Sequence, residues 1–213
     1  MILSFITKKP YRKRLLFSAG FSLVEALVAM GIFTVIGIAV MTFFSDIFSF
    51  SKSAQGQLQI QQELQVLTRR MSAELRAASQ SSVGSYALAT TSSSTLSFYV
   101  DTDNDGVKER IRYFLQGTEL KKGTLKPTGS PLAYTGSETT RSMVKNVQAT
   151  TTPLFSYYDT NYAGTTTPLT QPVTVSSVRL VKITIVVDDN ALIPPPAIIG
   201  TTQISLRTIK DNL

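Results

Sequence analysis

The apolar and polar positions divide the chain into a helical first part and a β-rich remainder. From Phe21 to Phe44 the sequence carries one charged residue, Glu25, and contains no proline. A helix of about 24 residues is roughly 36 Å long, enough to cross the ~30 Å hydrocarbon core of a bilayer. The pattern therefore predicts an apolar, membrane-spanning helix over residues 21–45.

The helical pattern continues over residues 46–80 but becomes amphipathic. Its apolar positions recur at steps of three and four, with polar residues between them, and are Leu64, Leu67, Met71, Leu75 and Ala78. The polar run SQSSVGS at 79–85 then stops the helix. We expect one helix of some 55 residues, apolar on all sides in its first half and packed by one stripe onto a domain in its second half.

The head over residues 86–213 reads as mostly β-structure. Alternating apolar and polar positions predict strands at 96–100, 107–115, 178–187 and 203–207, the last two paired antiparallel. Residues 117–123 are expected to form a turn. Residues 124–176, rich in Thr, Ser, Gly and Pro, are expected to be a loop-rich surface with short strands at 143–147 and 154–158. The predicted fold class is α+β: a long N-terminal helix on an antiparallel sheet of four or five strands.

Charge and composition narrow the possible functions. The chain of 213 residues has a formal charge of +7, but five basic residues lie before residue 15, so the rest carries only about +2. We therefore expect no nucleic acid as partner. The absence of Cys and His excludes a disulfide framework, a Ser-His triad, a thiol nucleophile and a His or Cys zinc site. We expect no enzymatic activity, although paired carboxylates remain open to an anchored enzyme.

The segment before the apolar helix is short and basic. Residues 1–20 contain no acid, and their basic residues are Lys8, Lys9, Arg12, Lys13 and Arg14. By the positive-inside rule this leader stays cytoplasmic and the chain beyond about residue 45 lies outside. A carboxylate inside a membrane helix is costly and usually has a partner, which singles out Glu25.

The residues Gly20-Phe21-Ser22-Leu23-Val24-Glu25 resemble the type IV prepilin signature, with a basic leader before it and an apolar helix after it. The resemblance implies that a membrane prepilin peptidase cuts after Gly20 and methylates the new amino terminus at Phe21. It also implies that Glu25 pairs with the free amine of a neighbouring subunit during assembly. An ordinary signal anchor, with Glu25 reaching the membrane interface, is the alternative.

The C-terminal hairpin and the strand–acidic turn–strand unit are also similar to those of J-type (PulJ/GspJ-like) minor pseudopilins of type II secretion systems. This resemblance implies a minor subunit of a type IV pilus-like or type II secretion filament. Its partners would be the prepilin peptidase, other pilins and an inner-membrane assembly platform, and its head would lie outside the cytoplasm. A membrane-anchored binding module that never enters a filament remains the alternative function.

One loop carries candidate metal chemistry. Between two predicted strands, Asp101, Asp103 and Asp105 stand at a spacing of two and Gly106 follows, as at the start of an EF-hand calcium loop. The twelfth position is Arg112, where a bidentate Glu is expected, and Glu109 would be a ligand only in a different geometry. Asp, Asn and Gly are also the residues that a solvated hairpin turn selects. A calcium loop and a plain turn both remain open, and no other cofactor is expected.

Overall fold

The computed structural model describes residues 20–148, 152–188 and 196–206. These residues form one long helix, eight strands and a short 3-10 helix, η1 (Val175–Ser177). The chain divides into two compact units, Met1–Phe50 and Ser51–Leu213. The expected leader lies outside the described residues except for Gly20.

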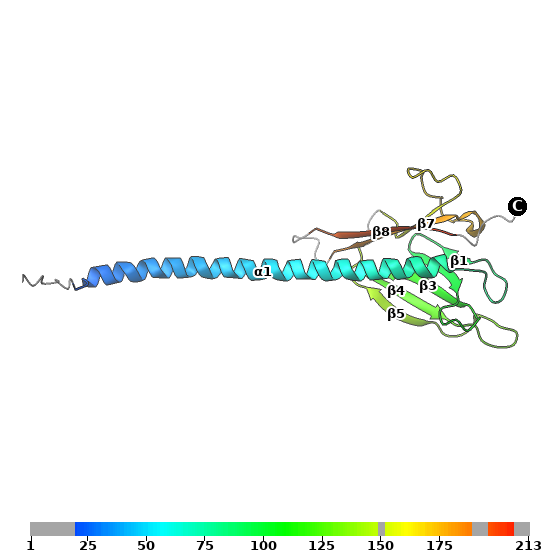
Figure 1. Cartoon of the computed structure of the whole chain (residues 1–213), viewed down its shortest axis with the longest axis horizontal. Coiled ribbons are helices and arrows are strands. Elements are labelled where there is room, and N and C mark those ends of the chain that lie inside the picture. Colours follow the sequence, from blue (N-terminus) through cyan, green and yellow to red (C-terminus); the bar gives the residue numbers. More distant parts are fainter. Residues whose placement is uncertain (1–19, 149–151, 189–195, 207–213) are drawn as a thin grey trace, which may run out of the picture. The chain divides into compact units, whose positions relative to one another are not determined.

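Helix α1 runs without a break from Leu23 to Arg76, 54 residues (Figure 1). Its interior contains no proline, and the serine hydroxyl of Ser22 caps its first turn by accepting a hydrogen bond from the backbone N–H of Glu25 at 3.2 Å. The predicted length of the helix is confirmed, and its end comes four residues before the expected residue 80.

The first sheet is an antiparallel meander in chain order. Its strands are β1 (Leu88–Thr91), β2 (Thr95–Val100), β3 (Glu109–Gln116), β4 (Glu119–Leu125) and β5 (Thr139–Val144). Residues 119–123, expected to be a turn, belong to β4. Leu120 is fully buried there and Lys122 pairs with Tyr113, so the turn contracts to Gly117-Thr118, where Gly117 has a φ of 60°.

The second sheet has three antiparallel strands in chain order, β6 (Phe155–Tyr158), β7 (Leu180–Val187) and β8 (Ile198–Ser205). The predicted pairing of the last two strands is confirmed, with Val181 opposite Ile204. The predicted alternation on β7 is also confirmed, since its inward residues Val181, Ile183, Ile185 and Val187 are buried. The α+β class is correct, but the strands form two sheets rather than one.

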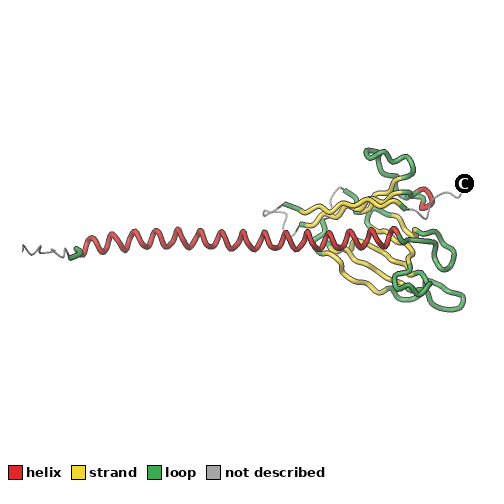
Figure 2. Tube along the Cα trace, viewed as in Figure 1, coloured by secondary structure: helices red, strands yellow, loops and turns green. Residues whose placement is uncertain are grey.

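The C-terminal half of α1 is packed against both sheets (Figures 1 and 2). Its predicted stripe is buried in the same apolar core as residues of β2, β3, β7 and β8. Toward the second sheet, the hydroxyls of Ser72 and Thr202 lie 3.3 Å apart. Packing on two sheets explains why a single stripe of the helix stays buried over three turns.

A polar cluster joins the helix to the first sheet. The Glu74 carboxylate accepts a hydrogen bond from the Tyr113 hydroxyl at 2.8 Å and forms an ion pair with the Lys122 ammonium at 2.6 Å. Tyr113 lies on β3 and Lys122 on β4, and the side chains of Glu74 and Lys122 are largely buried. The contact therefore links α1 to two adjacent strands of the first sheet.

Candidate functional site

The N-terminal half of α1 displays its apolar side chains to the outside. Large apolar residues between Leu23 and Phe50 are exposed on every side of the helix, among them Leu27, Phe33, Ile38, Met41 and Phe48. The helix is long and apolar enough to cross a membrane, and its most apolar window has no buried residue. A soluble surface rarely carries so large an apolar area, so this segment is an interaction surface for lipid, for protein or for both.

The residues of the predicted processing site lie at the start of that segment. Gly20 and Phe21 precede the helix and are exposed, and a Cβ built on Gly20 meets no atom within 4 Å. Glu25 is the third residue of α1, in the first turn. In the part of the chain that the structure describes, its carboxylate makes no hydrogen bond or ion pair, although its backbone N–H is capped by Ser22.

The first turn gives Glu25 a local role in addition to the predicted one. Ser22 and Glu25 stand three apart, as in a capping box, and a carboxylate near a helix N-terminus interacts favourably with the helix dipole. Neither the Ser22 cap nor the helix dipole uses a hydrogen bond to the carboxylate oxygens of Glu25, so these oxygens are available to a partner from another molecule.

The acidic loop between β2 and β3 is ordered by its own side chains. The Asp101 carboxylate accepts the backbone N–H of Gly106 at 2.9 Å, and that of Asp105 accepts the N–H of Val107 at 2.8 Å. Asn104 and Gly106 have φ values of 58° and 86°, a left-handed geometry that Asn and Gly tolerate. The loop therefore has the turn chemistry that the sequence predicts.

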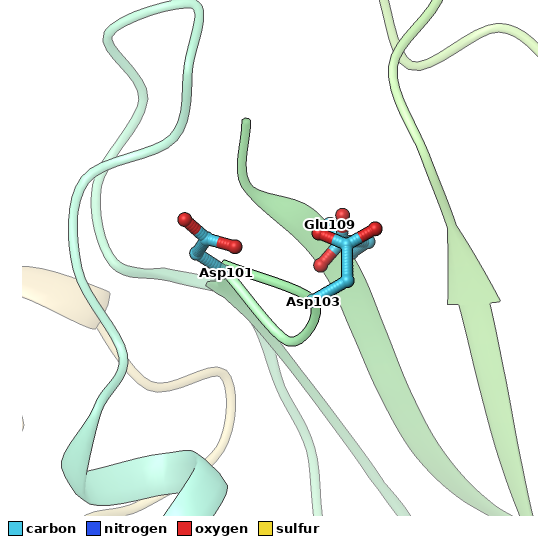
Figure 3. Close-up of side chains that lie close together, drawn as sticks. All are labelled: Asp101, Asp103 and Glu109. Atoms are coloured by element: carbon cyan, nitrogen blue, oxygen red, sulfur yellow. The ribbon is translucent and has the colours of Figure 1, made fainter. Parts of the chain in front are cut away.

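Three carboxylates from this hairpin come together (Figure 3). Asp101, Asp103 and Glu109 each offer an oxygen within 4.8 Å of the others. Glu109 begins β3, and its side chain is buried, with one oxygen accepting hydrogen bonds from the backbone N–H and the hydroxyl of Thr102 at 2.8 and 2.7 Å. Asp105, the third predicted ligand, is not a member of this group.

Lys126 follows β4 and provides the positive charge beside the loop. Its ammonium bonds to Asp105 and lies 3.0 Å from a carboxylate oxygen of Asp103 and 4.0 Å from one of Glu109. The hydrogen bond from Lys126, and then that from the Val107 N–H, hold the pKa of the exposed Asp105 carboxyl below its ordinary value. The bonds to Asp105 and Asp103 raise the pKa of Lys126 in turn.

Arg112, at the twelfth loop position, points to a different partner. Its guanidinium donates to the Glu138 carboxylate, 3.0 Å from Nε, and stands 4.0 Å over the ring of Phe114. It therefore does not contribute to the acidic group. The sequence pattern indicated no role for Lys126, and it suggested Glu109 only as a ligand of a different geometry. The signal that could have identified Glu109 is its position two residues before Ile111, on the strand face that also carries the buried Ile111 and Tyr113.

No protein-family model matches the chain, and the search of curated proteins found no match.

Proposed function

We propose that this chain is a structural subunit of a filament of the type IV pilus or type II secretion class. It would be inserted by residues 21–45, cleaved after Gly20, and then moved from the membrane into the filament. One observation carries the proposal: a continuous helix starts just after Gly20-Phe21, exposes its apolar side chains along its first half, and has one acid in its first turn.

The exposed apolar half of α1 needs an environment that removes it from water. Lipid supplies this environment before assembly, because the segment is long enough to span the hydrocarbon core. A bundle of the same segments from neighbouring subunits supplies it afterwards, because side chains on every side of the helix then meet other helices. A helix that is apolar all round suits both environments, whereas a helix packed on its own domain needs only one apolar stripe.

The pairing of Glu25 with a new amino terminus explains how assembly would be driven. Cleavage after Gly20 creates an ammonium at Phe21, and each of the two charges is expensive in an apolar surrounding unless it is paired. The Glu25 carboxylate lies four residues beyond Phe21 along the chain. The Phe21 ammonium of a neighbouring subunit would reach it if that subunit were shifted along the filament axis by about the same length. The pair would thus set the stagger between subunits.

The β-rich head would then lie outside the cytoplasmic membrane, with the prepilin peptidase, other pilins and an inner-membrane assembly platform as partners. We place the protein among minor subunits rather than as the main repeating one, on its likeness to J-type pseudopilins. The role is structural and not enzymatic. The amount of this chain relative to the main subunit in sheared filaments tests the minor assignment, which requires a ratio well below one.

The processing step is tested by mass spectrometry of the protein recovered from cells. We expect a mature chain that begins with a methylated Phe21. Gly20→Leu should leave the leader attached, and a Cβ at residue 20 would meet no atom within 4 Å, so the position has room for a side chain. A wild-type chain that still begins at Met1 would identify a plain anchor and overturn the proposal.

The pairing step is tested by Glu25→Ala. We expect normal membrane insertion but a loss of at least tenfold in filament incorporation, because a desolvated ammonium left without its partner costs several kcal/mol. Glu63→Ala is the matched control, since Glu63 is an exposed acid on the same helix outside the apolar half. Equal incorporation of Glu25→Ala and the control, measured in sheared filaments, would refute the pairing.

A further inference from the structure

We propose that the loop between β2 and β3 binds Ca²⁺ through the carboxylates of Asp101, Asp103 and Glu109. The proposal concerns the head alone and does not depend on the filament function. It replaces the ligand set that the sequence spacing predicts, because Glu109 takes the place of Asp105.

The buried Glu109 side chain carries the argument. Glu109 is 3% exposed, and one of its carboxylate oxygens is satisfied by two hydrogen bonds from Thr102. The other oxygen, Oε1, is shielded from solvent and has no hydrogen-bond partner within the described residues. A buried charged oxygen without a donor is strongly destabilising, and such an atom marks a position where a ligand or water binds.

A second carboxylate oxygen in the same group of residues also lacks a hydrogen-bond partner. Asp101 uses Oδ2 to hold the Gly106 N–H, while its Oδ1 is buried and has no hydrogen-bond partner in the described part of the chain. The orphaned oxygens of Asp101 and Glu109 thus come from the two ends of one loop, and Asp103 lies in the same group (Figure 3). One bound ion would provide a partner for both oxygens, so their missing hydrogen bonds would have a single explanation.

The spacing of the three carboxylates fits a calcium ion. Oxygens bound to one Ca²⁺ at 2.3–2.6 Å can be separated by at most about 5 Å, and the ligand oxygens here lie within 4.8 Å of one another. Mg²⁺ requires a nearly ideal octahedron at shorter distances, which an irregular loop supplies less readily. A ligand set made of carboxylates, without imidazole or thiolate, favours a hard cation over zinc or copper.

The charge balance also leaves room for a divalent ion. Four carboxylates lie in and beside the loop, and every ion pair to them among the described residues comes from Lys126. The Lys126 ammonium reaches Asp103 and Asp105 but stays 4.0 Å from the orphaned Oε1 of Glu109, beyond hydrogen-bond distance. Its side chain is 46% exposed, so it can turn to solvent when an ion binds.

Thermal unfolding of the full chain in detergent micelles, treated with chelator and then titrated with CaCl₂, tests the site. We expect Ca²⁺ at about 100 times its dissociation constant to raise Tm by about 5–10 °C. Asp103→Asn should abolish the shift and keep the fold, because Asp103 is half-exposed. Asp159→Asn removes the same charge from a turn elsewhere in the head and should keep the shift.

Lys126→Gln provides a variant in which binding should become stronger. Removing the competing ammonium should lower the dissociation constant for Ca²⁺ by about tenfold, measured by titration calorimetry. The proposal is overturned if the wild type shows no shift up to about 10 mM Ca²⁺, above the affinity range of extracellular calcium modules. An equal shift with MgCl₂, or an unchanged shift in Asp103→Asn, would overturn it as well.

Discussion

The two halves of α1 share one backbone conformation but have opposite surroundings. Met41 in the first half is 77% exposed, whereas Met71 in the second half is 1% exposed. Apolar residues surround the helix axis in the first half, whereas in the second they form a stripe with charged and amide side chains beside it.

This difference separates what a helix does for its own domain from what it offers to other molecules. The stripe of the second half is covered by two sheets of the same chain, and its burial contributes to the stability of the head. Among the described residues of its own unit nothing covers the apolar surface of the first half, so its burial is left for lipid or for other molecules. Matched substitutions in the two halves should therefore act on different properties.

The largest contrast is expected from a methionine pair. Met71→Ala should lower the free energy of unfolding of the head by about 2–5 kcal/mol, because it leaves a cavity under both sheets. Met41→Ala should change it by less than about 0.5 kcal/mol, because the Met41 side chain is 77% exposed and its removal leaves no cavity. Denaturant unfolding of both variants in detergent micelles measures the difference, and equal losses would contradict the comparison.

A smaller effect is expected at the polar contact of the second half. Lys122→Met should destabilise the head by about 1–3 kcal/mol, because the largely buried Glu74 loses its shorter ion pair. It keeps the Tyr113 hydroxyl and the half-exposed Arg70, whose Nε lies 3.2 Å away. Lys145→Met is the matched control, since Lys145 is mostly exposed and its nearest acid is 3.9 Å away. Thermal unfolding should separate the two variants, and a loss as small as that of the control would show that Lys122 does not hold the helix.

The smallest effect is a pH dependence confined to the head. Burial first, and then the Glu74 carboxylate, raise the pKa of the Tyr113 hydroxyl above its ordinary value of about 10. The unfolded chain loses this proton at a lower pH than the folded one, so the stabilisation is complete below about pH 10 and declines as pH rises above it.

The expected decline from this group is about 1.4 kcal/mol for each pH unit above about 10, and Tyr113→Phe should remove it. Unfolding measured between neutral and alkaline pH would show this as a flatter profile for the variant. Residues 23–50 contain no tyrosine, so the apolar half of α1 adds nothing to this dependence. A profile unchanged by Tyr113→Phe would contradict the assignment to that hydroxyl.

Much of the fold could be predicted because local periodicity records which side of an element is buried. The predicted steps of three and four from Leu64 to Leu75 correspond to the buried face of α1. The predicted alternation from Val181 to Val187 corresponds to the buried face of β7. The turn expected at 117–123 was wrong because strand pairing, which is not local, decides this segment. Two adjacent lysines and a glycine suggest a loop, but Leu120 and Lys122 are placed by their strand partners rather than by their own propensity.

The candidate sites differ in how far the sequence could locate them. Gly20, Phe21 and Glu25 depend on order along the chain, so their placement at the start of α1 follows directly from the spacing. The acidic group depends on hairpin register, since Val100 pairs with Glu109 and so returns Glu109 to the loop beside Asp101. Spacing alone favoured Asp105, whose carboxylate is held by Lys126 instead.

The sequence by itself determined the long helix, the division of that helix into an all-apolar and a one-sided half, and the antiparallel strands of the α+β head. Only the tertiary structure decided that the strands form two sheets, that Glu74 meets Tyr113 and Lys122, and that Glu109 joins Asp101 and Asp103 beside Lys126. The physical reason is that helix and strand periodicities depend on neighbouring residues. These contacts join residues that are separated in the sequence and are brought together only by strand register and packing.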